Sequence, residues 1–194
     1  MKDARQVTHE FPLIGHLVDL RLIEATDADF VHGLRTNEDL ARHLHPVSGT
    51  AADQRQWIET YKSREQAGTE FYFVILRKDV TPCGLVRLYD VLPSRFTWGS
   101  IILHPDRPAL AALEATVLSM AFGFETLDCR IAELDVRRAN THATAFYRRL
   151  GMRQVSEDDV DLFFEMTREE FTSRRPELDA AVLASASREP ARRP

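Results

Sequence analysis

The sequence predicts one mixed α/β domain in which a mostly antiparallel sheet is flanked by helices. Several short segments alternate apolar with polar residues, as half-buried strands do, and others repeat apolar residues at helical spacing. Between residues 96 and 137 a strand, a helix and a strand follow one another, which predicts a crossover between parallel strands. With 194 residues, the chain is long enough for one domain with a substantial core.

The first half of the chain supplies two helices and four strands. Residues 1–15 lack a sustained periodicity and are expected to form an N-terminal arm. The expected elements are then a strand at 17–22, a helix at 27–37, a loop at 38–50, a helix at 51–67 capped by Thr50, a hairpin of strands at 71–78 and 83–92, and a strand at 96–104.

The second half continues with two helices and three strands. The expected elements are a helix at 108–126, a strand at 130–137, a helix at 140–150, and two strands near 153–156 and 160–167. Strands 96–104 and 130–137 should be parallel neighbours because a helix joins them. The sheet therefore has six to seven strands and about four helices, the domain spans residues 16–172, and residues 173–194 form a tail that is partly helical or disordered, with one or two helical turns.

Composition and charge exclude several classes of function. The net charge of −5 argues against broad binding to nucleic acid or anionic membranes, because both require a basic surface. Cys83 and Cys129 are too few for a disulfide framework and indicate a reducing compartment. The N-terminus lacks the apolar stretch of a signal peptide, and the most apolar helical segment, 109–124, is too short to cross a bilayer. We expect a cytoplasmic protein without nucleic-acid or membrane partners.

No metal site is predicted. His43 and His45 in "HLHP" have no third ligand at a useful spacing, and the acidic turn "SEDDVD" lacks the ligand spacing and glycine of a calcium loop. The acidic turn is interpreted as the solvated end of a hairpin.

The stretch "NTHATAFYRRLGM", residues 140–152, predicts a short helix with a marked start and stop. Asn140 occupies the N-cap position and Gly151 the position of a left-handed C-terminal residue. Ala143, Phe146 and Leu150 recur at helical spacing and can form a buried stripe. Tyr147 flanks this stripe, so its hydroxyl is either the polar end of a core residue or a group directed at a ligand.

The order of elements, together with this helix directly after the parallel strand, resembles the GNAT-type N-acetyltransferases over residues 16–170. The resemblance implies a sheet splayed at the parallel pair, acetyl-coenzyme A as co-substrate and Tyr147 as the catalytic acid facing the cofactor sulfur. It also implies a backbone N–H within 100–103 as the donor to the carbonyl oxygen. The expected cofactor-binding residues are Ile101, Ile102, Leu103, Arg107, Ala109, Leu110, Ala111, Ala112 and Asn140.

The sequence departs from the family pattern at two places. In the pyrophosphate segment "RPALAA", Arg107 and Ala112 fit, but Leu110 stands where the central glycine is expected. A helix N-terminus still offers unpaired N–H groups to a phosphate, and the leucine side chain can face the core if this turn is helical. The glutamate that many relatives carry in the fourth strand is replaced by Thr97.

The missing glutamate leaves the base and the acceptor side open. Asp90, Glu70, His45 and His104 are the alternative bases, and the residues expected to bind the acceptor are Glu70, Tyr89, Asp90 and His45. The aromatic residues Trp57, Tyr61, Tyr89 and Trp98 either stack on a sugar or base or pack in the core.

The resemblance implies transfer of an acetyl group to the primary amine of a small molecule. Residues 35–61 resemble the acceptor side of the ribosomal-protein and nucleotide-sugar branches, and the glycine-poor loop after "HPDRP" is closer to the nucleotide-sugar branch. A nucleotide-linked amino sugar is therefore the favoured acceptor. The alternatives are a protein N-terminus, an aminoglycoside, or a module that binds acyl-CoA without turnover. We expect a monomer or homodimer.

Overall fold

The computed structural model describes residues 10–44 and 46–188. Within these residues the chain forms an eight-stranded sheet with the order β1-β2-β3-β4-β5-β6-β8-β7. The strands are β1 (Leu13–Ile14), β2 (Val18–Leu22), β3 (Phe71–Arg77), β4 (Pro82–Tyr89), β5 (Arg95–Leu103), β6 (Ile131–Arg137), β7 (Arg153–Glu157) and β8 (Asp161–Thr167). The mixed α/β fold is confirmed. The strand beyond the expected six to seven is β1, which lies in the segment expected to be an arm.

All neighbouring strands pair antiparallel except β5 and β6, whose parallel pairing is confirmed. This parallel pair is short, because only residues 95–97 of β5 lie opposite residues 131–133 of β6. Beyond Thr97 and Glu133 the two strands continue but no longer pair. The sheet is therefore open along the second half of β5.

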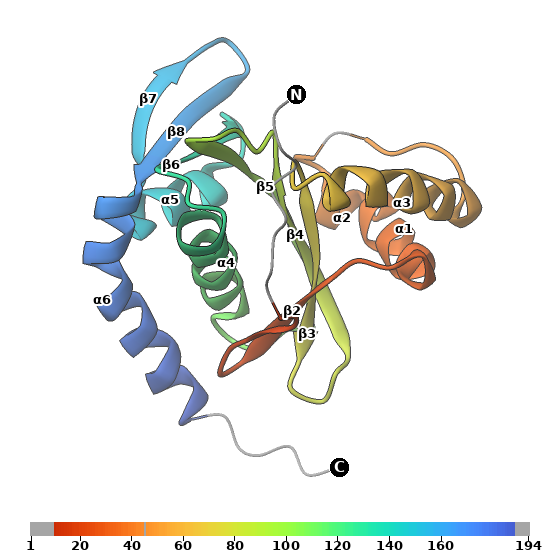
Figure 1. Cartoon of the computed structure of the whole chain (residues 1–194), viewed down its shortest axis with the longest axis horizontal. Coiled ribbons are helices and arrows are strands. Elements are labelled where there is room, and N and C mark those ends of the chain that lie inside the picture. The colour runs from red at the N-terminus through yellow and green to blue at the C-terminus, as the bar shows by residue number, and fades with distance from the viewer. Residues whose placement is uncertain (1–9, 45, 189–194) are drawn as a thin grey trace.

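Helices cover both faces of the sheet. In Figure 1, α1, α2 and α3 lie on one side of the sheet, and α4 and α6 lie on the other. The helices are α1 (Ala28–Thr36, after a 3₁₀ turn at Ala25–Asp27), α2 (Glu38–Ala41), α3 (Ala51–Gln66), α4 (Ala111–Ala121, continued by a π-helical turn at Phe122–Thr126), α5 (Thr141–Leu150) and α6 (Arg168–Ala186). No helix among the described residues is both long and apolar enough to cross a membrane.

Three helical features differ from the sequence predictions. The loop expected at 38–50 begins with the short helix α2, whose first amides bond to the side chain of Asn37. The helix expected at 108 begins at Ala111, because Leu110 has left-handed backbone angles. The last helix, α6, is longer than the one or two turns expected. Its start is fixed by a capping box between Thr167 and Glu170.

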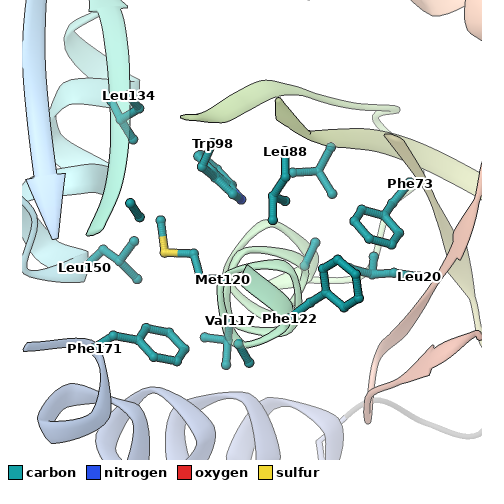
Figure 2. Close-up of a cluster of buried hydrophobic side chains, with 14 of the residues drawn as sticks. Leu20, Phe73, Leu88, Trp98, Val117, Met120, Phe122, Leu134, Leu150 and Phe171 are labelled. Carbon is teal, nitrogen blue, oxygen red and sulfur yellow. The ribbon is translucent and has the colours of Figure 1, made fainter. Parts of the chain in front are cut away.

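The main core lies between the sheet and the helices α4 and α6. Figure 2 shows Met120 of α4 below Trp98 of the sheet, while Val117 lies on the opposite side of α4. On the far side of α4, Phe171 of α6 closes the same cluster, which explains why α6 is ordered despite its polar composition. Burial of such large apolar side chains is the main stabilising contribution to a domain of this size. A second, smaller cluster joins α1 and α3 to the opposite face of the sheet.

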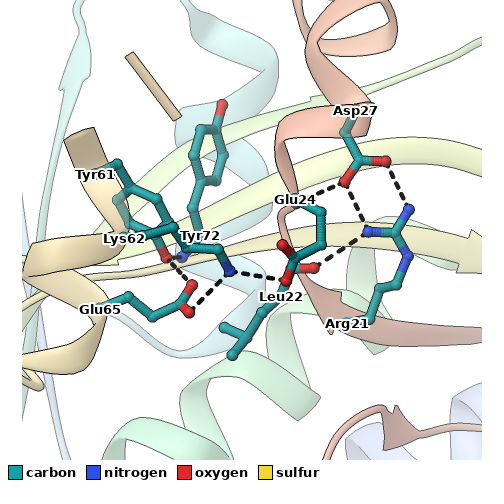
Figure 3. A network of polar contacts seen from close by, with 8 residues as sticks. All are labelled: Arg21, Leu22, Glu24, Asp27, Tyr61, Lys62, Glu65 and Tyr72. Carbon is teal, nitrogen blue, oxygen red and sulfur yellow. Dashed lines mark hydrogen bonds and ion pairs between the residues drawn. The ribbon is translucent and has the colours of Figure 1, made fainter. Parts of the chain in front are cut away.

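Polar contacts complement the second cluster where α1 and α3 meet β2 and β3 (Figure 3). Arg21 donates two hydrogen bonds of 2.7 Å to the carboxylate of Asp27. Burial acts to raise the pKa of Asp27, but the hydrogen bonds from Arg21 and from the Glu24 amide outweigh it and hold this pKa below its usual value. The Tyr61 hydroxyl accepts a 2.7 Å bond from the Tyr72 amide. The Arg21–Asp27 pair fixes the turn before α1 against β2, and the Tyr72–Tyr61 bond fixes helix α3 against strand β3.

A buried carboxylate ties the N-terminal hairpin to helix α4. Glu114 is 4% exposed and accepts hydrogen bonds from the backbone amides of His16, Leu17 and Val18. Three amide donors compensate the charge of a carboxylate that has lost its water. The turn between β1 and β2 is therefore held against the helix that begins at residue 111.

Candidate active site

A cavity of about 650 Å³ lies where β5 and β6 diverge. One side, which the resemblance assigns to the acceptor and which we call the acceptor side, comes from α1, α2 with the following loop, and β4: Arg35, Asp39, Leu40, Arg42, His43, Leu44, Arg87 and Tyr89. The opposite side, which the resemblance assigns to the cofactor and which we call the cofactor side, comes from the end of β5, the start of α4, and α5: Gly99, Ser100, Ile101, Leu103, Arg107, Ala112, Asn140, His142, Ala143, Phe146 and Tyr147. Asp135, Val136 and Arg137 of β6 also line the cavity. The volume lies in the range of small-molecule sites.

A bulge in β5 shapes the middle of the cavity. The register of β5 against β4 shifts between Gly99 and Ile102, and Ser100 has a positive φ of 52°. Beyond Thr97, the edge of β5 that faces β6 has no strand partner among the described residues. The backbone groups of residues 100–103, predicted to include the donor to the carbonyl oxygen, are therefore at an open sheet edge that lines the cavity.

Helix α5 begins and ends as the sequence predicts. The Asn140 side chain accepts a hydrogen bond from the Ala143 amide, and Gly151 has a φ of 101°. The buried face differs from the predicted stripe: it consists of Thr144, Tyr147 and Leu150, while Ala143 and Phe146 are half-buried and line the cavity. Tyr147 is thus central to the buried face and not at its flank.

The ring of Tyr147 is packed in the core, but its hydroxyl is not used there. The ring lies edge-on to Trp98 at 5.9 Å between centroids, and Tyr147 is 7% exposed. Its hydroxyl makes no hydrogen bond to any residue in the described part of the chain, and it lines the cavity. A buried tyrosine hydroxyl usually has a partner, so this arrangement favours the interpretation that the hydroxyl faces a ligand.

A second tyrosine and an aspartate share this electrostatic environment. Burial, and then the negative charge of Asp135, raise the pKa of Tyr147 above its usual value; the same two causes raise the pKa of Tyr89 to about 12. Asp135 lines the cavity from β6, and its carboxylate forms no ion pair or hydrogen bond within residues 10–44 and 46–188. The cavity therefore contains the unpaired carboxylate of Asp135, whose negative charge acts on two protonated tyrosines.

The start of α4 has an unusual geometry. Leu110 has φ 60° and ψ 8°, a left-handed conformation that glycine adopts without strain, and its side chain is 42% exposed. Leu110 is expected to face the core only if this turn is helical; the turn is not helical at Leu110, and Ala111 is the fully buried residue instead. The amides of Ala112 and Leu113 have no hydrogen-bond partner among the described residues, which fits the binding of a pyrophosphate at this helix start.

The structure brings together only part of the predicted site. Of the predicted cofactor residues, Ile101, Leu103, Arg107, Ala112 and Asn140 line the cavity. Ala109 and Leu110 are exposed outside its lining, whereas Ile102 and Ala111 are buried in the core.

The predicted acceptor residues and alternative bases are mostly elsewhere. Tyr89 lines the cavity, but Asp90 is exposed and outside the lining, and His45 lies outside the described residues. Glu70 is 4% exposed and paired with two arginines, so it is not available as a base. His104 is exposed near Asp106 and outside this lining.

The other aromatic candidates are core residues, with one exception. Tyr61 and Trp98 are fully buried, and the Trp98 indole N–H donates a 2.8 Å hydrogen bond to Ser119. Trp57 is 36% exposed and borders a second hollow, beside Arg87.

Sequence reasoning missed Asp135 and the arginines of the acceptor side. The alternation of Glu133, Asp135 and Arg137 with apolar residues placed Asp135 on one face of its strand. The last residue of β6 that pairs with β5 is Glu133, and Asp135 is the next acidic residue on the same face. The sequence does not show where this strand pairing ends. Arg35 and Arg87 come from elements far apart in the chain, so no local pattern indicated that they meet.

The fold and the cavity define an acyltransferase, and comparisons with known proteins specify its family. The GNAT acetyltransferase domain model matches residues 18–153. The structure of apo FdhC, described as a nucleotide-linked sugar GNAT, is 33% identical with a TM-score of 0.83, covering 90% of this chain and 99% of that one. Among curated proteins, none matches this sequence.

Two more distant structures share the fold. Spermidine N-acetyltransferase from Vibrio cholerae, in complex with CoA and spermine, is 18% identical with a TM-score of 0.70, covering 81% of this chain and 99% of that one. A GCN5-related N-acetyltransferase from Brucella melitensis is 20% identical with a TM-score of 0.71, covering 93% and 87%. The chain belongs to the GNAT acetyltransferase family. It is an acyl-CoA-dependent N-acetyltransferase, and acetyl-CoA is its co-substrate.

Proposed function

We propose that the protein acetylates the primary amine of a nucleotide-linked amino sugar, by direct attack of the amine in a ternary complex. The observation that carries this proposal is the cationic character of the acceptor side, where Arg35, Arg42 and Arg87 line the cavity. A guanidinium group binds phosphate oxygens through two parallel hydrogen bonds, and a nucleotide-linked sugar brings a diphosphate. FdhC, at 33% identity, is described as a nucleotide-linked sugar GNAT, which supports a nucleotide-linked acceptor for this chain.

The same charges argue against a polyamine or an aminoglycoside as the acceptor. Both are polycations at neutral pH, and three arginines along the acceptor side repel them. The two acidic residues of the cavity, Asp39 and Asp135, are outnumbered by these arginines. An acceptor with one amine and several negative charges fits this distribution best.

On the cofactor side, residues at the start of α4 and along β5 would hold acetyl-CoA. Arg107 and the free amides of Ala112 and Leu113 would bind the pyrophosphate, and the open edge of β5 at residues 100–103 would receive the amides of the pantetheine arm. A donor on that edge would stabilise the negative charge that develops on the carbonyl oxygen during transfer.

Two cavity residues would move or hold protons during transfer. Asp135 accepts a proton from the acceptor's ammonium group, which leaves a neutral amine that can attack the thioester carbon. As the C–N bond forms and the C–S bond breaks, the nitrogen loses a second proton and the departing thiolate gains one, so one proton is released overall. Tyr147 donates a hydrogen bond to that thiolate. Because its pKa is raised, Tyr147 stays protonated, and the thiol (pKa about 8.5) is the stronger acid.

The acceptor is tested by thiol release from acetyl-CoA against a panel of amines. The panel contains nucleotide-linked amino sugars, the same amino sugars without the nucleotide, spermidine, an aminoglycoside and a peptide with a free N-terminus. We expect the highest kcat/KM for a nucleotide-linked amino sugar and a large loss without the nucleotide. Preference for spermidine, the aminoglycoside or the peptide would overturn the proposal.

The cofactor seat is tested by thermal denaturation with acetyl-CoA. A ligand that binds only the native state raises the Tm, so millimolar acetyl-CoA should do so. Ala112→Asp places a negative charge beside the proposed pyrophosphate position and should reduce this shift, whereas Arg149→Ala, on the exposed face of α5, should not. An equal shift in all three proteins would contradict the proposed seat.

A further inference from the structure

A second hollow, of about 360 Å³, adjoins the cavity on the side of α1 and α3. Arg35 and Arg87 line both spaces, so they form the boundary between them. The second hollow is otherwise lined by residues of α1, the loop before α3, α3 itself and Tyr72 of β3. The acetyl transfer proposed where β5 and β6 diverge does not involve this hollow.

Gln54 is the unexplained polar group of the second hollow. Its side chain lines the hollow on α3 and is 9% exposed, yet it makes no hydrogen bond to any residue within the described ranges. Because the side chain is nine-tenths buried, few water molecules can reach the amide, and a ligand in the hollow that offers both a donor and an acceptor would replace them. Neighbouring polar residues do not share this feature, since Thr50 and Asp53 bond to each other in a capping box.

We propose that this hollow is a subsite for the nucleobase of the acceptor, with the Gln54 amide binding the pairing edge of the base. An amide presents one acceptor beside one donor, which complements a base edge with an adjacent donor and acceptor. This inference rests on the proposed function and extends it to the nucleoside part of the substrate.

The spatial order of the groups matches the order of a nucleotide-linked sugar. Gln54 lies in the second hollow, Arg35 and Arg87 lie at the boundary, and Asp135 and Tyr147 lie in the cavity. A base, a diphosphate and an amino sugar, bound in that sequence, place the amine beside the reacting groups.

The two boundary arginines are held in position by protein contacts. The Arg87 guanidinium bonds to the buried Glu70 and lies 5.5 Å from the Trp57 ring centroid and 4.9 Å from that of Tyr89. Arg35 is hydrogen-bonded to the Tyr72 hydroxyl. Guanidinium groups that are already ordered lose less side-chain entropy when they bind a diphosphate.

The test uses UDP, dTDP, ADP and GDP as probes and Trp57 fluorescence as the readout, because Trp57 lines the hollow while Trp98 is fully buried. The variant is Gln54→Leu, which keeps the packing volume and removes the amide. The control is Gln56→Leu, an exposed glutamine on the same helix.

We expect at least one nucleoside diphosphate to bind, and we expect Gln54→Leu to raise its Kd by about 10- to 100-fold. The control should bind normally, and KM for acetyl-CoA should be unchanged in both.

The Tm supplies an independent readout. Since the amide has no partner among residues 10–44 and 46–188, Gln54→Leu should melt at the same temperature as the natural protein or higher, whereas a structural glutamine would give a lower Tm. Absence of nucleotide binding, or equal binding by Gln54→Leu, overturns the subsite. If nucleotide-linked amino sugars are acetylated equally well by Gln54→Leu, the subsite is wrong and the proposed function stands. If nucleoside diphosphates bind through Gln54 but no nucleotide-linked amino sugar is acetylated, the subsite stands and the proposed function is wrong.

Discussion

The buried carboxylate of Glu70 accepts a 2.7 Å hydrogen bond from Nε of Arg87 and thereby fixes the guanidinium that borders both the cavity and the second hollow. The other carboxylate oxygen accepts a 2.7 Å bond from Arg64, which lines neither space. Glu70, predicted to bind the acceptor, is therefore a positioning residue for Arg87.

Replacing Glu70 with Gln should raise KM for the acceptor by about tenfold, because Arg87 loses a charge-assisted hydrogen bond that holds its orientation. KM for acetyl-CoA should not change. Arg64→Ala is the control, since it removes the other partner of Glu70 without touching the cavity. Steady-state kinetics of both variants with each substrate checks this prediction. An equal rise of the KM for the acceptor in Arg64→Ala would show that Glu70 does not act by orienting Arg87.

Replacing Tyr147 with Phe should lower kcat by about 10²-fold, the lower end of the range for acid–base groups, because water can partly replace the lost donor. The ring stays in place and the hydroxyl has no described protein partner, so stability should change little. Tyr61→Phe is the opposite case. Its hydroxyl bonds to the Tyr72 amide and to Glu65, so this variant should lose about 1–3 kcal/mol of stability and keep its kcat. Full turnover by Tyr147→Phe would mean that its hydroxyl is only the polar end of a core residue.

Replacing Asp135 with Asn should lower kcat by about 10²–10⁴-fold, because no carboxylate remains to take the proton from the ammonium group of the substrate. It should also lower the pKa of Tyr89 from about 12, because the negative charge that disfavours the tyrosinate is removed. Absorbance titration of the tyrosines measures this change without any acceptor present. Asp159→Asn, an exposed aspartate in the turn between β7 and β8, should alter neither quantity. Unchanged kcat in Asp135→Asn would exclude it as the base.

Replacing Leu110 with Gly should leave the free energy of unfolding nearly unchanged or raise it by up to about 1 kcal/mol. Glycine removes the cost of about 1–2 kcal/mol of a left-handed L-residue, and its greater freedom in the unfolded chain offsets part of that gain. Leu183→Gly, at an exposed leucine of α6, should instead cost about 1 kcal/mol. Chemical denaturation of both variants distinguishes the two effects. A loss of about 1 kcal/mol of stability in Leu110→Gly as well would show that the left-handed backbone at Leu110 is not strained.

Stability should fall steeply in alkaline solution. Burial raises the pKa values of all four tyrosines above the ordinary value of about 10, and it raises the pKa of Cys83 to about 11. A group with a raised pKa in the folded state contributes fully below its unfolded pKa, and the contribution is lost as the pH rises through the folded pKa. The midpoint of denaturant unfolding should therefore be constant from pH 7 to 8. It should decrease above about pH 10, where the tyrosines of the unfolded chain begin to lose their protons. A constant midpoint to pH 11 would be inconsistent with these burials.

Features encoded by nearby residues could be predicted from the sequence. The caps at Asn140 and Gly151, the hairpin of β3 and β4, and the parallel pair of β5 and β6 depend on neighbours in the chain or on the crossover rule. The conformation of Leu110 could not be predicted, because the local sequence "RPALAA" is compatible with a helix from its first residue.

The proposed base and the positioning residue required the tertiary structure. Asp135 is distinguished from Glu133 only by where the pairing of β6 with β5 stops. Glu70 looked like a free carboxylate beside a strand, and only the approach of Arg64 from α3 and Arg87 from β4 shows that it is neutralised.

The bonds from Glu114 to the amides of residues 16–18 also define how the protein can be shortened. The span matched by the family model, residues 18–153, would cut this hairpin and remove two of the three amides that compensate the carboxylate. The same span would remove β8, which carries β7, and α6, which covers α4. The smallest unit able to fold by itself is therefore larger than residues 18–153, and its N-terminal limit lies before Gly15.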